Sequence, residues 1–206
     1  MNLNNIKNDN ENLKKELNKI INDDNMNEIF KFSFDKYYNE NGEKYIGEMK
    51  IGLKDGKGIL YYDKDKEYKR KRYEGEFKND KREGKGILYW NNGDRYEGDY
   101  KNDKKEGKGI FYYNNGDRYE GDWINDKREG KGIFYYNSGN RYEGDYKNDK
   151  KEGKGIYYWD DGYRYEGEYK NDKIEGKVIF YYNNGKIEEG NWINDKKEEK
   201  GFFKFW

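Results

Sequence analysis

Residues 96–118 read YEGDYKNDKKEGKGIFYYNNGDR, and close copies of this segment fill most of the chain. The leading tyrosine recurs every 23 residues, at Tyr73, Tyr96, Tyr119, Tyr142 and Tyr165. An earlier copy of 28 residues begins at Tyr45, and a degenerate last copy begins at Glu188. Self-similarity at a fixed period predicts an array of stacked units, each too small to fold alone.

The spacing inside one copy predicts two strands. Aromatic and glycine residues alternate with charged ones over residues 96–100, a pattern typical of a half-buried strand. Residues 107–113 are rich in aromatic side chains and predict a second strand, with a polar loop over residues 102–106. The segment Asn114-Asn-Gly-Asp117 predicts a hairpin turn of two or three residues, since Asn-Gly tolerates positive φ. We therefore expect an all-β fold, an elongated single-layer antiparallel meander of stacked hairpins.

Nearly all 26 glycines recur with the copies, which predicts a steric role. At the centres of adjacent strands they would let aromatic rings lie across the backbone. A phosphate-binding loop is the weaker interpretation, because such a loop occurs once and opens a helix. The predicted structural glycines are Gly75, Gly84, Gly86, Gly98, Gly107, Gly109, Gly121, Gly130, Gly132, Gly144, Gly153, Gly155 and Gly167.

Two aromatic residues from each copy form a predicted ladder along the array. The ladder is expected to be mainly structural, but a single layer cannot bury both of its faces. An exposed aromatic groove rimmed by Lys and Asp is therefore the expected surface for a protein partner or for self-association. Its candidate residues are Tyr73, Phe77, Tyr96, Tyr100, Tyr119, Trp123, Tyr142, Tyr146, Tyr165 and Tyr169.

The two ends differ from the array. Residues 1–28 are Asn-rich and either form an amphipathic helix, which caps the array or self-associates, or are disordered. Residues 29–44, with Phe30, Phe32 and Phe34, predict a capping strand. The seven copies span residues 45–206 and begin at 45, 73, 96, 119, 142, 165 and 188, the last one acting as a cap.

The composition excludes several classes of function. The chain has no Cys and no His, which excludes disulfides, thiol and imidazole catalysis and the usual zinc, copper and haem sites. The repeated carboxylates, such as Glu97 and Asp99, alternate with the ring face and are expected to point toward solvent. We therefore expect no enzyme activity, no cofactor and no metal. No apolar run could span a membrane and no secretory signal is visible, so a cytoplasmic location is expected.

One dense basic cluster consists of Lys69, Arg70, Lys71 and Arg72. It is either a solvated tip or a contact for anionic lipid at the membrane periphery, each basic residue contributing about 1 kcal/mol. The 43 basic residues balance 43 acidic ones, so nucleic acid is not an expected partner.

The pattern YxGxxxxxxxxGxG, followed by an aromatic pair and NG, resembles the MORN repeat (membrane occupation and recognition nexus). The clearest instance runs from Tyr73-Glu-Gly75 to Gly84-Lys-Gly86, and the resemblance covers about residues 45–206. It implies an antiparallel β-meander and a non-enzymatic scaffold or adaptor role. The leading hypothesis is a scaffold that binds a protein partner, or itself, through the aromatic groove; the alternative is a peripheral membrane module that binds anionic phospholipids or phosphoinositides. Val178, Glu188 and Glu199 depart from the pattern in the last two copies.

Overall fold

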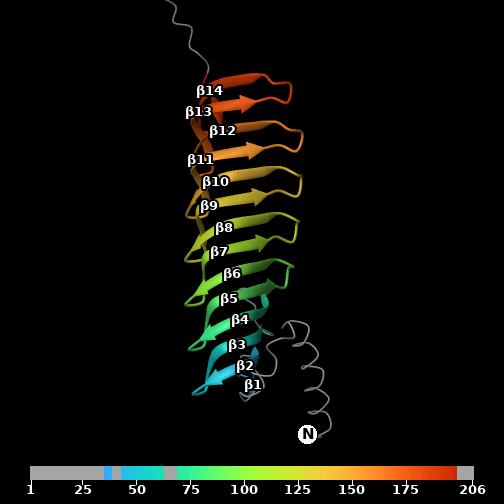
Figure 1. Cartoon of the computed structure of the whole chain (residues 1–206), viewed down its shortest axis with the longest axis vertical. Helices are drawn as coiled ribbons and strands as arrows, with labels where there is room; N and C mark the ends of the chain where they lie inside the picture. Colours follow the sequence, from blue (N-terminus) through green and yellow to red (C-terminus); the bar gives the residue numbers. More distant parts are fainter. Residues whose placement is uncertain (1–34, 39–42, 63–68, 199–206) are drawn as a thin grey trace, which may run out of the picture.

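The chain forms one 15-stranded sheet in which each strand pairs with its neighbours in sequence. The computed structural model describes residues 35–38, 43–62 and 69–198, and Figure 1 shows their strands stacked in chain order along a rod. Every strand pair is antiparallel, so the predicted all-β meander is confirmed. Over these residues, no helix is long and apolar enough to cross a membrane.

The strand bounds show how the repeats divide into hairpins. The strands are β1 (Asp35–Tyr38), β2 (Glu43–Lys50), β3 (Leu53–Tyr62), β4 (Arg70–Lys78), β5 (Lys81–Trp90), β6 (Arg95–Lys101), β7 (Lys104–Tyr112), β8 (Arg118–Ile124), β9 (Lys127–Tyr135), β10 (Arg141–Lys147), β11 (Lys150–Tyr158), β12 (Arg164–Lys170), β13 (Lys173–Tyr181), β14 (Ile187–Ile193) and β15 (Lys196–Lys197).

The tight turn of the last six repeats is an Asn-Asp pair, and the first repeat has Ile51-Gly52 in its place. Asn102 and Asp103 join β6 to β7 with φ of 49° and 69°, and positive φ at both central residues is the signature of a type I′ hairpin turn. The loop predicted over residues 102–106 is therefore wrong, because β7 already begins at Lys104. Asn and Asp tolerate the left-handed conformation, which lets a two-residue turn replace a longer loop.

The NNGD segment lies in the longer of the two connections. Residues 113–117 link β7 to β8, and a backbone hydrogen bond between Tyr113 and Asp117 closes a loop of three residues, 114–116. The predicted turn of two or three residues is therefore confirmed. The backbone N–H of Tyr113 donates to the Asp117 carbonyl at 3.0 Å, and the Gly116 N–H donates to the Tyr113 carbonyl at 3.0 Å. The resulting register places Phe111 opposite Tyr119.

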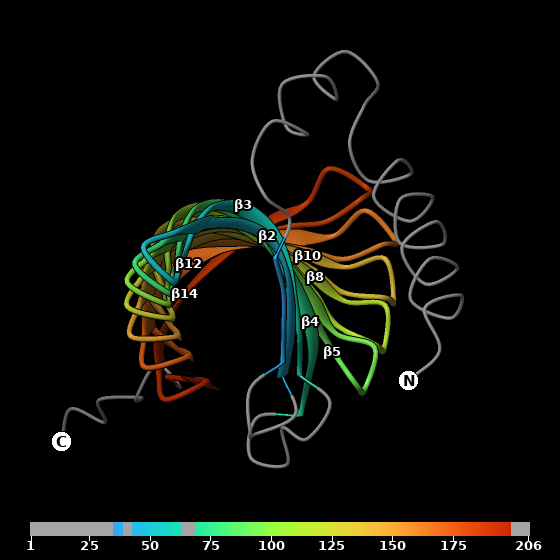
Figure 2. The same cartoon turned by 90° about the horizontal axis from the view of Figure 1, so that it is seen from below.

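A β-bulge interrupts the hairpin in the middle of each of the first six repeats. Gly98 pairs with Gly109, but the next residue, Asp99, pairs with Glu106, which leaves Gly107 and Lys108 as extra residues on β7. Gly107 has a φ of 64°, where a side chain would be strained. Bulges bend and twist a sheet, and Figure 2 shows the sheet curved into an open arch when viewed along the rod.

The aromatic face is the inside of this arch. Lys151 lies beside the Asn-Asp turns, whereas Tyr136 lies at the opposite rim, just after β9. The Lys151 ammonium nevertheless donates to the Tyr136 hydroxyl at 3.1 Å. Side chains from opposite rims can meet only on the concave face.

Glycine allows this face to build a core. The Tyr96 ring lies over Gly98 and Gly109, where an added Cβ atom would come within 2.5 and 2.3 Å of the tyrosine hydroxyl. That hydroxyl donates to the Asp99 carbonyl at 3.2 Å. Tyr96 also packs edge to face on Tyr100, with centroids 5.3 Å apart. The ring therefore packs where a side chain on Gly98 or Gly109 would clash with it.

Each Asn-Asp turn also ties its repeat to the preceding one. The Asp126 carboxylate accepts a hydrogen bond from the Lys105 backbone N–H at 2.9 Å, and the Asp126 N–H donates to the Lys105 carbonyl at 3.1 Å. Glu106 accepts from the Asn125 N–H at 3.1 Å. The same carboxylate contact recurs at Asp80, Asp103, Asp149, Asp172 and Asp195.

The ends are described only in part. Strand β1 (Asp35–Tyr38) lies within the segment expected to cap the array and pairs with β2. The expected helix over residues 1–28, the strand residues Phe30, Phe32 and Phe34, and the end of the last copy from residue 199 lie outside the described residues.

Candidate functional site: a groove on the concave face

The ten predicted ladder residues lie in the core of the arch. Their exposed fractions range from 0 to 6%, and edge-to-face contacts connect successive rings over most of the array. Buried rings cannot present a surface to a partner. This corrects the assignment of the partner-binding surface to Tyr73, Phe77, Tyr96, Tyr100, Tyr119, Trp123, Tyr142, Tyr146, Tyr165 and Tyr169.

A second row of rings covers this core and is only half-buried. Successive centroids lie 4.6 to 6.5 Å apart. We call it the outer aromatic row, and it consists of Trp90, Phe111, Tyr113, Phe134, Tyr136, Tyr157, Trp159 and Phe180. The signal for it is present in the repeated IFYY motif, since alternate residues of a strand share a face and Phe111 lies opposite the buried Tyr119.

A row of cations follows the opposite flank of the groove. Its members are Arg82, Lys105, Arg128 and Lys151, one from each of four successive repeats. The two arginines pair with the aspartates of the next turn, at 3.2 Å between Arg82 Nε and Asp103 Oδ1 and 3.4 Å between Arg128 Nε and Asp149 Oδ1. Their guanidinium groups also lie over tyrosine rings of the core.

Lys105 differs from these arginines because its ammonium lies among rings. Nζ is 4.1 Å from the Trp123 ring centroid, 5.0 Å from that of Phe111 and 5.4 Å from that of Tyr96. Burial lowers the pKa of Lys105 to about 8, and the charge of Asp126 offsets only part of this effect. Among the described residues no carboxylate forms an ion pair with this ammonium.

The groove widens toward its N-terminal end. A cavity of about 600 Å³ lies over Leu60 and Leu88, with Tyr62 and Trp90 in its wall. Lys105 and Arg82 line it as well, together with the aspartates of three neighbouring turns. We call this region the widened segment.

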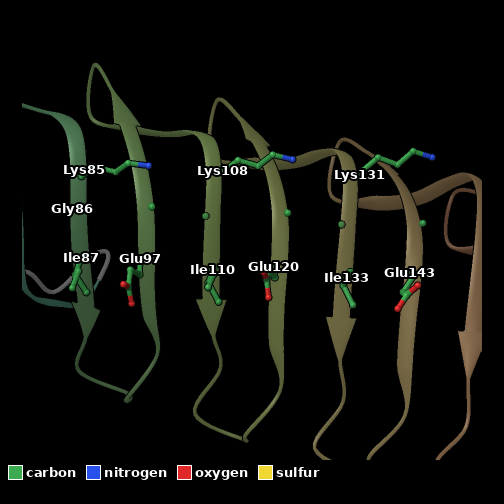
Figure 3. Close-up of a pocket in the computed structure, with 15 residues that line it drawn as sticks. Lys85, Gly86, Ile87, Glu97, Lys108, Ile110, Glu120, Lys131, Ile133 and Glu143 are labelled. Atoms are coloured by element: carbon green, nitrogen blue, oxygen red, sulfur yellow. The ribbon is translucent and has the colours of Figure 1, made fainter.

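The convex face has a different character. This face holds a valley of about 920 Å³. It lies between a row of lysines and a row that alternates Ile with Glu (Figure 3). Three of these lysines each pair with an aspartate on the next strand, at 2.5 to 2.6 Å: Lys85 with Asp99, Lys108 with Asp122, and Lys131 with Asp145. The charges are balanced in pairs. An arginine guanidinium lies 4.2 Å from the ring centroid of each half-buried tyrosine in the row Tyr89, Tyr112, Tyr135, Tyr158 and Tyr181, so these rings are already covered.

The predicted glycines play two structural roles. The second glycine of each GKG pair joins a continuous stripe of cross-strand partners, from Gly75 opposite Gly86 to Gly155 opposite Gly167. The first glycine is the bulge residue with positive φ, at Gly84, Gly107, Gly130 and Gly153. None of these positions forms a loop that opens a helix in the described part of the chain.

The basic cluster is spread over both faces. The Arg70 guanidinium lies 4.4 Å from the Tyr62 ring centroid inside the groove. Arg72 lies 4.2 Å from the Tyr89 centroid and is hydrogen-bonded to Glu74. Lys69 and Lys71 are exposed. Two of the four charges are therefore already engaged within the protein.

Within the described ranges, no group of three or more Asp or Glu side chains is placed to hold a metal ion.

Comparisons with known proteins identify the repeat. The MORN repeat family matches residues 45–65, 73–95, 96–118, 119–141, 142–162, 165–187 and 189–205. No curated protein sequence matches the chain.

Two solved structures share a distant likeness of fold. The TCP domain of SAS-4 (dCPAP) of Drosophila melanogaster, in complex with a proline-rich motif of Ana2 (dSTIL), is 16% identical, with a TM-score of 0.44 over 77% of this chain and 89% of that chain. The wild-type TCP10 domain of Danio rerio CPAP is 13% identical, with a TM-score of 0.27 over 76% of this chain and 82% of that chain. Likeness at this level carries no functional inference.

Proposed function

Because the chain belongs to the MORN repeat family, we propose that it is a non-enzymatic scaffold whose concave groove binds a segment of a protein partner. The observation that carries the proposal is the outer aromatic row, a continuous line of half-buried rings along the groove. Aromatic and arginine side chains in concave sites contribute a large share of the binding energy in protein interfaces.

Side chains, rather than backbone, would hold the partner. Every strand from β2 to β14 already has a neighbour on both sides, so strand addition is confined to the two ends of the sheet. Along the groove the partner would meet rings such as Tyr113 and Tyr136 on one flank and the cation row on the other. A second copy of the chain is a special case of such a partner.

Adjacent residues that face opposite sides of the sheet provide a matched test. Tyr113 and Tyr136 belong to the outer aromatic row, whereas Tyr112 and Tyr135 lie on the convex face, where the guanidinium groups of Arg95 and Arg118 lie 4.2 Å from their ring centroids. The double variant Tyr113→Ser/Tyr136→Ser should lose proteins captured by the wild type from native lysate. The double variant Tyr112→Ser/Tyr135→Ser should retain them.

Four further measurements complete the test. Circular dichroism and thermal unfolding verify that both double variants fold, and light scattering of the purified protein detects self-association. Flotation with phosphoinositide-containing vesicles at about 0.1 M salt tests the lipid alternative, since salt screens weak surface attraction. Equal capture by both double variants, or binding to vesicles alone, would refute the proposed groove.

A further inference from the structure

One ring position of the repeat is occupied by leucine in the first two copies. Later copies place Phe111, Phe134, Tyr157 and Phe180 at this position, whereas the first two place Leu60 and Leu88 there. Both leucines lie in the core, with 6 and 4% of their surface exposed. They line the cavity of about 600 Å³ in the widened segment. The smaller side chains therefore leave space that rings fill farther along the groove.

The wall of this cavity contains an unused hydrogen-bonding group. Tyr100 lines the widened segment and is 3% exposed, and its hydroxyl has no hydrogen-bond partner among the described residues. Leaving a buried polar group unpaired costs about 1–3 kcal/mol. The hydroxyl is itself buried, so the apolar space and the surrounding charges, and not Tyr100, decide what the cavity can accept.

The side chains that line the cavity carry a net charge of +1: the cations Lys54, Arg70, Arg82, Lys104 and Lys105 against the carboxylates Glu43, Asp80, Asp103 and Asp126. Lys54 pairs with Asp80 at 3.4 Å, and Arg82 pairs with Asp103 at 3.2 Å. The ammonium of Lys105 forms no ion pair in the described part of the chain, and the charge of Asp126, which also lines the cavity, offsets its burial only in part. An anionic group is therefore favoured beside an apolar space.

We propose that the widened segment is a subsite for a partner segment that carries a bulky apolar side chain next to a carboxylate. This proposal rests on the proposed function of the groove. The apolar side chain would fill the space over Leu60 and Leu88, and the carboxylate would pair with Lys105. The volume of the cavity lies within the range of about 300–1,000 Å³ that is typical of ligand sites.

Continuity with the groove identifies the occupant as part of a protein segment. Trp90 forms one wall of the cavity and also begins the outer aromatic row, with its ring 5.3 Å from that of Phe111. A chain lying along that row would thus deliver a side chain directly into the widened segment. The leucines place this subsite in the first third of the array, which gives the groove a direction.

The test uses a random peptide library displayed on phage and selected on the full chain. We expect the wild type to enrich peptides that carry Asp or Glu next to Leu, Phe or Trp. The double variant Leu60→Phe/Leu88→Phe introduces the ring that later repeats already carry, so it should fold while filling the cavity. We expect it to bind the selected peptides at least about tenfold more weakly.

Matched variants test separately the filling of the cavity, the charge of Lys105 and the effect of added rings on the fold. Ile87→Phe/Ile110→Phe adds the same rings on the convex face, where both isoleucines line the valley, and should bind peptide like the wild type. Lys105→Gln should remove the preference for Asp and Glu and keep the apolar preference. Lys105→Arg should keep the apolar preference but weaken the acidic one, since Arg82 and Arg128 at this position pair with the aspartate of the next turn.

The outcomes distinguish the subsite from the groove. Peptides that bind the filled variant normally but lose affinity for Tyr113→Ser/Tyr136→Ser would overturn the subsite and leave the groove in place. Failure to enrich any peptide, or enriched peptides indifferent to both double variants, would overturn both proposals. Enriched peptides without acidic residues would refute the role of Lys105, and binding of anionic vesicles alone would assign the cavity to lipid.

Discussion

The ring of Tyr119 lies across Gly132 so closely that a Cβ atom on this glycine would come within 2.4 Å of the tyrosine hydroxyl and 2.5 Å of Cε2. The hydroxyl reaches past the glycine to donate to the Asp122 carbonyl at 3.2 Å. Repeated along the array, this relationship gives a single-layer sheet a core without a second layer. Where Val178 replaces the glycine, the ring of Tyr165 is displaced, and its angle to Tyr169 falls to 32°.

Substitution of Gly132 should therefore destabilise the fold strongly. We expect Gly132→Ala to lower the free energy of unfolding by about 1–3 kcal/mol, the usual range for overpacking. Gly167 belongs to the same stripe, but its nearest contact is the Val178 methyl group at 3.0 Å, so Gly167→Ala should cost less. Urea denaturation of both variants measures the difference, and equal losses would contradict the steric role of the rings.

Asp126 should stabilise the array through its carboxylate and not merely through its turn conformation. Asp126→Gly keeps the positive φ but removes the acceptor for the Lys105 N–H, and we expect a loss of about 1 kcal/mol. Asp126→Asn keeps both the conformation and an acceptor oxygen and should cost less. Thermal unfolding of the pair checks this, and identical midpoints would show that the contact between repeats contributes nothing.

The buried tyrosines should make the protein sensitive to alkali. Burial is the main factor that raises the pKa of Tyr45, Tyr73, Tyr96, Tyr119 and Tyr142 above the ordinary value of 10.0. As the pH rises, these tyrosines therefore ionise in the unfolded chain before they ionise in the folded one. The stability that they contribute is complete below about pH 10 and falls as the pH rises further. We expect tyrosinate absorbance and loss of circular dichroism to appear together. Ionisation of most tyrosines near pH 10 in a folded protein would contradict this.

Much of the fold could be predicted from the sequence. The alternation of Tyr96, Gly98 and Tyr100 with charged residues predicts the strand, its buried face and the contact between ring and glycine. The turns could not be assigned in the same way. Asn102 and Asp103 are common in loops of any length, and only the pairing of Lys104 with Lys101 shows that two residues suffice.

The site was harder to predict because it depends on curvature. A flat sheet would leave the Tyr96 ladder accessible, whereas the bulge at Gly107 and the arch place a second row of rings over it. Phe111 and Tyr113 belong to the repeat pattern, but only the strand register shows on which face of the sheet their side chains lie. Whether Leu88 leaves a cavity in the groove likewise depends on which rings surround it in the folded sheet.

Loss of the last hairpin should expose a sheet edge. Strand β14 covers β13, and Trp192 packs on Phe180 with centroids 5.7 Å apart. Deletion of residues 187–206 leaves the backbone groups of β13 unpaired, and we expect association or aggregation. Deletion of residues 199–206 keeps β14 in place and serves as the control. Light scattering compares the two, and a monomeric product of the longer deletion would show that β14 does not act as a cap.

Photo-crosslinking from two adjacent residues tests the groove most directly. The photoreactive amino acid benzoyl-phenylalanine would replace Tyr136, on the concave face, or Tyr135, on the convex face, in the full chain in its native cells. We predict that position 136 crosslinks to a distinct polypeptide, or to a second copy of the chain, and that position 135 does not. Crosslinks of equal yield from both positions, or from position 135 alone, would contradict the assignment of partner binding to the concave groove.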